Sequence, residues 1–288
     1  MSENPPKSTR DTAARPALAD EMPAVPKLTG WLSRRRTVRE YDADATIPDE
    51  EIRAILDAGR KAPTSGTIQM YSFVSVRDPE MRARIHEAAG GGQPRIEEAS
   101  HFFLVCIDLR RVRLLHDHRD LEFEMAPMTA VLKGAVDAAL AAQGTITAAE
   151  SYGYGVCPIG AISEGLSTIS EIVDLPAEVL PAFGLCIGVP VGETHDEPTP
   201  RIPLDAVVHE DSYEDPSPEL LEACYEEMNE LYAGTDRVWE GALAHYWTPS
   251  PDGSMNNREG ELLETLRQQG FFAYRGVDES LSELDRDE

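Results

Sequence analysis

The segment from Met128 to Glu150 constrains the fold most, because it is long, dense in alanine, leucine and valine, and apolar on most sides. A helix of this composition is buried all round, either within a core or against a second subunit. Its alanines also permit another helix to approach closely. We therefore predict one long helix that has no face turned to solvent.

A second helix is predicted to begin between Thr46 and Glu51, where a proline stands in the first turn and acids lie near the positive end of the helix dipole. Three apolar residues supply its buried face, and a glycine and a proline end it: Ile52, Ile55, Leu56, Gly59 and Pro63. Short β-rich runs at 71–76, 102–107 and 183–189 predict strands. Helices mixed with isolated strands, without regular alternation, indicate an α+β fold.

The chain divides into one domain with two appendages. Residues 1–27 are rich in proline, alanine, serine and charge and are predicted to form a disordered arm, whereas residues 277–288 form an acidic tail. Residues 28–276 contain no internal repeat and no long Gly/Ser linker, which predicts a single continuous domain. No apolar run reaches the ~20 residues that cross a bilayer.

The net charge of −26 disfavours nucleic acids and anionic membranes as partners. The acid excess fits either adaptation to high salt or an ordinary acidic protein from a GC-rich genome, and both readings stay open. Four dispersed cysteines predict reduced core residues in a cytoplasmic protein: Cys106, Cys157, Cys186 and Cys224. Because the chain has neither a CxxC pair nor a Cys/His cluster, we expect no metal.

Four arginines fall within six residues of the segment Ser33–Tyr41, although the chain as a whole is acidic. Arg36 and Arg39 are three residues apart, which would place them on one face of a helical turn. Guanidinium groups bind phosphate bidentately, so the cluster suits an anionic ligand. Taken alone, however, such a cluster is more often a solvated surface patch.

About one helix later, the segment Ala62–Gln69 offers hydroxyls, an amide and an unhindered backbone. On its own it is also a simple turn after a helix. If the two segments converge on one ligand, the arginines would take a phosphate and this segment a polar ring edge. Flavin mononucleotide (FMN) has both parts.

Two further segments have a functional and a structural interpretation. The glycines of Ser151–Ala161 could let backbone N–H groups approach a planar ligand, or could cap the preceding helix and start a buried loop. The spacing is not that of a dinucleotide-binding fingerprint. Pro198–Pro203 is a rigid extended segment that presents Arg201, either as a phosphate ligand or on a surface crossover.

Together these segments resemble the nitroreductase family of FMN-dependent oxidoreductases. The opening signature is SRRRTVREY, then IPDEEIRAILDAGRKAPTS, then Gln69. The later segments DAALAAQGTITAAESYGYGVCPIGAI, LPAFGLCIGVPV, PRIP, VVHEDSY and LRQQGFFAYR resemble one subgroup, the oxygen-insensitive NADPH nitroreductases and NADPH-flavin oxidoreductases. The resemblance covers residues 28–276, with the segments in the right order and at compatible spacings.

The resemblance implies a two-fold symmetric α+β homodimer, with a central mixed sheet flanked by helices and the long helix at the subunit interface. FMN would lie in a cleft between the subunits. The first motif would hold its phosphate, ribityl and pyrimidine parts, and the second would border it from the partner chain. The residues that match the family's cofactor-binding positions are Arg35, Arg36, Thr37 and Arg39 in the first motif, Thr64, Ser65, Gly66 and Gln69 in the second, and Gln93, Gly160, Ala161 and Arg201 elsewhere.

Three positions depart from the family pattern. Thr199 stands where a lysine is usual beside Arg201, Ser163 stands where an arginine is often found, and Thr67 replaces an asparagine. FMN binding should survive, since several arginines are present. The preference between NADPH and NADH and the choice of substrate are less well defined by the sequence.

The implied reaction is ping-pong hydride transfer, from NADPH or NADH through FMN to a nitroaromatic, a quinone or a free flavin. No protein residue need act as a general acid, since solvent can supply the proton. One alternative is a flavin-dependent dehalogenase or dehydrogenase on the same scaffold, whose substrate lid could lie in residues 211–251. Others are an FMN-binding protein without turnover and an acidic scaffold without cofactor.

Overall fold

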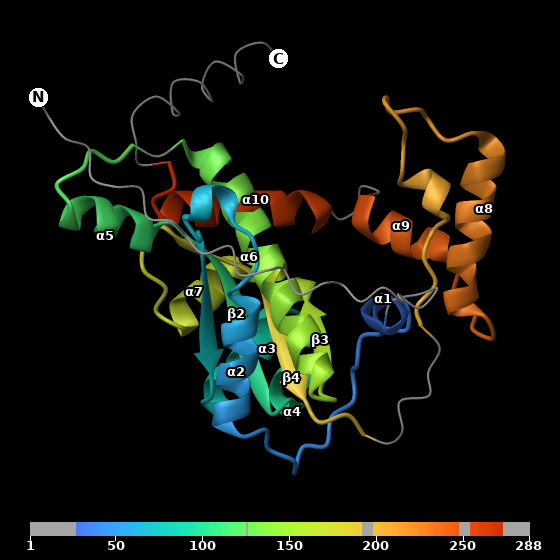
Figure 1. Ribbon diagram of the computed structural model, residues 1–288, viewed down its shortest axis with the longest axis horizontal. Coiled ribbons are helices and arrows are strands. Elements are labelled where there is room, and N and C mark those ends of the chain that lie inside the picture. The colour runs from blue at the N-terminus through green and yellow to red at the C-terminus, as the bar shows by residue number, and fades with distance from the viewer. Residues whose placement is uncertain (1–26, 125, 192–197, 248–253, 273–288) are drawn as a thin grey trace, which may run out of the picture.

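A four-stranded sheet lies at the centre of the computed structural model, which describes residues 27–124, 126–191, 198–247 and 254–272 (Figure 1). Its strands, in the order β1-β2-β4-β3, are β1 (Tyr71–Val76), β2 (His101–Asp108), β4 (Val179–Gly188) and β3 (Gly155–Ile159). Every pair of neighbours is antiparallel. The expected mixed sheet would need a parallel pair, and the strands of the described residues form none.

Helices cover both faces of this sheet. On one face lie α2 (Asp49–Gly59) and α6 (Pro127–Ser151), which pack against Phe103, Val105 and Leu185. On the other lie α3 (Pro79–Ala88), α4 (Arg95–Glu98) and α7 (Leu166–Ile172), which pack against Phe102 and Leu104. Because both faces are covered, β2 is buried along its whole length and reads in sequence as a continuous apolar run.

The helix α2 confirms the prediction for its segment, since it ends at Gly59 and buries Ile52 and Ile55. It crosses α6 at very short range: a Cβ on Gly59 would lie 2.0 Å from Thr145 Oγ1, and one on Gly144 would lie 3.1 Å from the Gly59 carbonyl oxygen. Close approach through small residues, which the alanine content predicted for α6, therefore occurs here.

One face of α6 is not buried within the chain. Four large side chains spaced by four residues form an exposed apolar stripe: Met128, Leu132, Val136 and Leu140. The sequence predicted burial on all sides, either in the core or against a second subunit. Within one chain, the face of α6 opposite the stripe is buried in the core as predicted, whereas the stripe itself is not buried.

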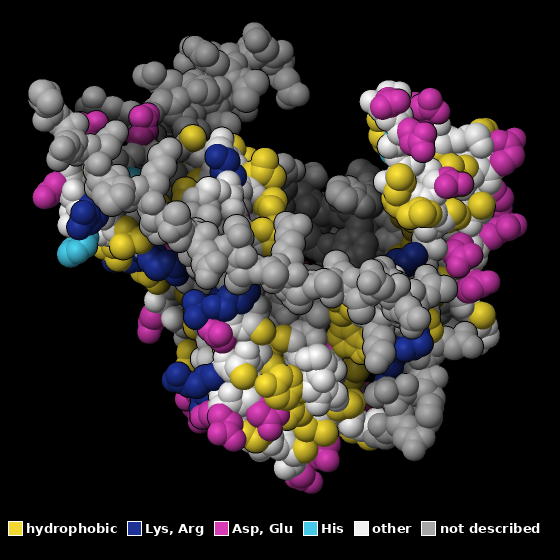
Figure 2. Space-filling view, viewed as in Figure 1, with side chains coloured by type: hydrophobic (Ala, Val, Ile, Leu, Met, Phe, Trp, Pro, Cys, Tyr) yellow, Lys and Arg dark blue, Asp and Glu magenta, His cyan; other side chains and the backbone are white. Residues whose placement is uncertain are grey.

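The remaining helices are α1 (Lys27–Leu32), α5 (Arg110–His118), α8 (Pro218–Asn229), α9 (Trp239–Trp247) and α10 (Ser254–Gln268). Four short 3-10 turns accompany them: η1 (Ser65–Thr67), η2 (Gly160–Glu164), η3 (Leu204–Ala206) and η4 (Glu230–Tyr232). Helices α8 and α9 project away from the sheet, whereas α10 packs on α7 (Figure 1). Acidic and hydrophobic side chains are mixed over the surface of α8 (Figure 2).

The four cysteines are buried, as predicted for core residues, and none of them pairs with another. No helix of the described part of the chain is long and apolar enough to span a membrane. The predicted arm, apart from Lys27, and the predicted acidic tail lie outside the described residues.

Candidate functional site

The arginine-rich motif begins in a turn at Ser33 and Arg34, and its residues 35–40 have no regular secondary structure and follow the edge of the sheet. Val38 donates its backbone N–H to the carbonyl of Val156 in β3 (3.0 Å), and Asp42 donates to Val189 just beyond β4 (2.8 Å). The helical turn predicted for Arg36 and Arg39 is therefore wrong, because the backbone groups that a helix would use are bonded to the sheet instead.

Two glycines permit this close approach. A Cβ on Gly155 would lie 2.6 Å from Val38, and one on Gly188 would lie 2.5 Å from the ring of Tyr41. Val38 and Tyr41 are buried, and the Tyr41 hydroxyl donates to the Val38 carbonyl at 3.0 Å. The motif is thereby fixed from both sides, which leaves Arg39 exposed and Thr37 half-buried next to it.

Arg35 faces an acid that the sequence analysis did not single out. Its Nε lies 3.0 Å from Glu150 Oε1 at the end of α6, and both side chains are largely buried. The contact does not have hydrogen-bond geometry, and the buried Nε and Nη2 atoms of Arg35 are without a hydrogen-bond partner among the described residues. Burial raises the pKa of Glu150, and the Arg35 guanidinium acts in the opposite direction.

Gly160 and Ala161 follow β3 directly, in η2. Gly160 is exposed, and a Cβ built on it meets no atom within 4 Å. The loop that carries Gln93 lies beside η2, since a Cβ on Gly90 would lie 2.6 Å from Glu164 Oε2. Arg95 Nη1 donates to Gln93 Oε1 at 2.5 Å.

Several of these side chains surround Cys157 in β3. Burial raises the pKa of the Cys157 thiol, and the positive charges of Arg95, Arg39 and Arg35 act against that shift. The structure therefore brings the arginine motif and the Gln93 loop together around β3, the strand that leads into Gly160 and Ala161. Arg95 is the member of this group that the sequence analysis missed.

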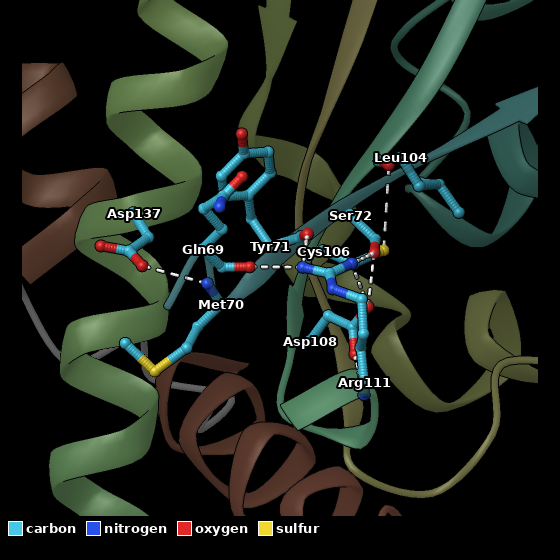
Figure 3. Close-up of polar contacts among 9 residues, drawn as sticks. All are labelled: Gln69, Met70, Tyr71, Ser72, Leu104, Cys106, Asp108, Arg111 and Asp137. Carbon is cyan, nitrogen blue, oxygen red and sulfur yellow. Dashed lines mark hydrogen bonds and ion pairs between the residues drawn. The ribbon is translucent and has the colours of Figure 1, made fainter. Parts of the chain in front are cut away.

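The second predicted segment lies around η1, and Figure 3 shows Gln69 at its end and the contact of Met70 with Asp137 of α6. Asp137, on the buried face of α6, accepts the backbone N–H of Ser65 at Oδ1 (2.8 Å) and that of Met70 at Oδ2 (3.0 Å). Thr64 precedes the turn in an extended conformation. Gly66, Thr67 and Gln69 have left-handed φ values of 56°, 60° and 60°.

The two predicted motifs are therefore separated along α6. The second is bonded to Asp137 and the first to Glu150, thirteen residues later, which corresponds to roughly 20 Å along the helix axis. Within one chain they do not converge on a single ligand. For both motifs to contact one ligand, the second motif would have to come from another copy of the chain, as the family resemblance implies.

A cleft of about 1120 Å³ lies beside the second motif. Its walls combine apolar and aromatic side chains with arginines, and they include Gly66–Gln69, Leu56, Tyr71, Phe73, Phe103, Arg53 and Arg111. Arg201 is exposed, and its Nη1 donates to the carbonyls of Thr199 and Pro200 in its own segment, at 2.9 Å each.

Sequence reasoning missed Asp137 and Glu150, although a signal for both was present. Each is an acid within a helix predicted to be buried, and a buried carboxylate needs a hydrogen-bond or charge partner. Their partners, however, lie 72 and 115 positions away in the chain, at Ser65 and Arg35. No local pattern identifies such partners.

The chain is similar to known proteins in sequence and in fold. A family model described as Nitroreductase family matches residues 32–192. An FMN reductase (NAD(P)H) of Bacillus subtilis is 34% identical, over 83% of this chain and 96% of the relative. Nitroreductase A from Vibrio parahaemolyticus has a TM-score of 0.74 at 28% identity, over 86% of this chain and 98% of that one. The NADPH:FMN oxidoreductase from Vibrio harveyi complexed with NAD+ has a TM-score of 0.67 at 29% identity, over 80% and 97% of the two chains.

Proposed function

The chain belongs to the nitroreductase family, and from this premise we propose that it is an FMN-dependent NAD(P)H oxidoreductase. Nitroaromatics, quinones or flavins are its acceptors, reduced in a ping-pong cycle. The observation that carries the proposal is the arginine motif bonded to β3, the strand that leads into the exposed Gly160 and the half-buried Ala161. Bound FMN supplies the hydride chemistry that ordinary side chains lack.

The residues around β3 fit FMN in charge and in shape. Arg36, Thr37 and Arg39 would hold its phosphate, ribityl and pyrimidine parts. Gly160 and Ala161 would present backbone N–H groups to the ring, because no Cβ blocks the approach at Gly160. Arg39 would stabilise negative charge on the reduced ring electrostatically. Gln93 would border the ring, with its Oε1 turned toward Arg95.

We assign Arg35 a less direct part. Its partner Glu150 takes up much of its charge, and its Nη2 donor is unsatisfied but buried, so the side chain would have to move before Nη2 could bind a phosphate. Arg201 remains a proposed phosphate ligand. Turning toward a phosphate would require its guanidinium to leave the carbonyls of Thr199 and Pro200.

The active form is proposed to be a homodimer. The exposed stripe on α6 has the size and spacing of a helix-packing surface, with Leu132 67% exposed in the single chain. A two-fold partner would cover this stripe and bring its Thr64, Ser65, Gly66 and Gln69 to the flavin. The separation of the two motifs along α6 supports this arrangement. A cytoplasmic location is also proposed, and it fits four free cysteines.

The deciding experiment is the visible spectrum of the purified protein, recorded before and after anaerobic addition of NADPH and, separately, NADH. We expect a yellow protein that bleaches and recovers its colour when a nitroaromatic or a quinone is added. A yellow protein that neither donor bleaches would favour a non-catalytic FMN binder. A colourless protein that takes up no FMN would refute the proposal.

One variant tests the assignment of the arginine motif. Arg39→Ala removes a positive charge from an exposed side chain without disturbing the buried Val38 and Tyr41. We expect weaker FMN retention or slower reduction of the flavin by NADPH. Normal flavin content together with a normal reduction rate would contradict the role given to Arg39.

A further inference from the structure

We infer that Asp137 and Arg111 are positioning residues that hold the loop 65–70 in the conformation that meets FMN. The inference rests on the proposed function, in which the loop 65–70 of one subunit borders the flavin held by the other. It names two residues that would set FMN affinity through this loop. Neither residue was predicted from the sequence. Both act on the backbone of the loop, so they would influence FMN without touching it.

The conformation of the loop needs external support. Gly66, Thr67 and Gln69 all have left-handed φ values near 60°. Glycine adopts this region freely, but threonine is β-branched and populates it only rarely. Such backbone strain persists where surrounding groups over-determine the conformation, and it clusters at ligand-binding sites. The side chains of Thr67 and Gln69 are exposed, so burial of these two side chains does not supply the support.

Asp137 supports the loop 65–70 at its base. The residue is completely buried, and each carboxylate oxygen accepts one backbone N–H, from Ser65 and from Met70. One side chain therefore joins the two ends of the loop and leaves residues 66–69 to project. Because Asp137 is shielded from water, these hydrogen bonds are electrostatically stronger than they would be at the surface.

Arg111, at the start of α5, supports the C-terminal end of the loop 65–70 (Figure 3). Its Nη2 donates to the carbonyls of Gln69 and Tyr71, the latter at 2.9 Å, and its Nη1 donates to Ser72 Oγ at 3.0 Å. Asp108 orients the guanidinium through Oδ2 at 3.1 Å from Nη1. Because Arg111 also lines the cleft, the support and the ligand-accessible wall are continuous.

The test compares Asp137→Asn and Arg111→Met with two controls. Asp137→Asn keeps the size of the side chain but replaces one acceptor with a donor. Arg111→Met removes the donors from a side chain that is 44% exposed, so this variant should fold even where the buried substitution does not. Thr145→Val alters another buried polar residue of α6. The Thr145 hydroxyl donates to the Ala141 carbonyl, one turn earlier in the same helix, and not to the loop. Arg84→Met removes an exposed arginine of α3, which packs on the other face of the sheet.

The first measurement is hydrogen exchange in the FMN-free protein. In Asp137→Asn, at least one of the amides of Ser65 and Met70 should exchange about 10- to 100-fold faster, which is the range expected when a buried donor loses its acceptor. The second is the FMN dissociation constant, which should rise at least about tenfold in both test variants and stay within about twofold in both controls.

The outcomes separate the inference from the function on which it rests. Unchanged exchange at Ser65 and Met70 would overturn the inference, and so would faster exchange with unchanged FMN affinity. If Thr145→Val weakened FMN binding as much as Asp137→Asn, the effect would be general destabilisation of α6, which also overturns it. A wild-type protein that binds no FMN would refute the proposed function, whereas the exchange rates would still decide whether Asp137 holds the loop.

Discussion

The contact between Gly155 and Val38 predicts that Gly155→Ala destabilises the protein, whereas the general preference for alanine over glycine in strands would predict stabilisation. Glycine inside a strand costs roughly 0.5–1 kcal/mol relative to alanine, because it loses more conformational freedom on folding. At an unconstrained strand position, Gly→Ala would therefore stabilise the protein. Gly155 is constrained, since an added Cβ would meet three atoms of the Val38 side chain at 2.6, 2.7 and 2.9 Å.

Val38 cannot move aside easily. Its N–H is bonded to the Val156 carbonyl, and its own carbonyl accepts the Tyr41 hydroxyl. Overpacking of this kind costs about 1–3 kcal/mol. When the midpoint of the gain in residue preference is subtracted from the midpoint of the overpacking cost, we expect Gly155→Ala to lower the free energy of unfolding by roughly 1 kcal/mol.

The assay is urea unfolding of the FMN-free protein at a fixed protein concentration. Gly92→Ala is the control, because a Cβ there meets no atom within 4 Å and φ is not left-handed. In a Val38→Ala background the cost of Gly155→Ala should fall, since two of the three clashing atoms are gone, and the double-mutant cycle measures that coupling. Gly155→Ala as stable as wild type, or more stable, would refute the reasoning.

Three further predictions address the ring site, the interface and pH. Gly160→Ala should leave the free energy of unfolding within about 0.5 kcal/mol of wild type, because the new methyl meets no protein atom. It should raise the FMN dissociation constant, because the methyl would point at the flavin. Equal FMN affinity in a flavin titration would count against the ring contact. Leu132→Glu should give monomers in sedimentation velocity, since it charges the centre of the α6 stripe, whereas an unchanged dimer would place the interface elsewhere. Burial lowers the pKa of His101 below its ordinary 6.5, and Asp49 only partly opposes this. The unfolded chain then binds the extra proton, so this contribution to stability is full above about pH 6.5 and is lost as the pH falls below it. Urea midpoints should therefore drop more between pH 7.5 and 5.5 in wild type than in His101→Gln, and parallel drops would exclude His101 as the cause.

Local sequence patterns predicted the elements that depend on periodicity and on chain breakers. The strand at 71–76 was predicted with the bounds that the structure has, and the helix predicted to begin within 46–51 and to be ended by Gly59 and Pro63 runs from Asp49 to Gly59. The strand β3 was missed, because its glycine and Pro158 read as a loop. Proline is tolerated there because β3 is an edge strand, and edge position is a property of the sheet rather than of the segment.

By itself the sequence determined the chemistry available to the site: guanidinium groups in one motif, hydroxyls and an amide in another, and glycines after a long apolar helix. It could not place those groups relative to one another. That Arg36 and Arg39 do not lie on a helical turn was decided by hydrogen bonds to Val156 in β3 and to Val189 just beyond β4. The roughly 20 Å between the two motifs was decided by the straight course of α6. Hydrogen bonds such as that between Ser65 and Asp137 join positions far apart in the chain, so they exist only once the tertiary structure has brought those positions together.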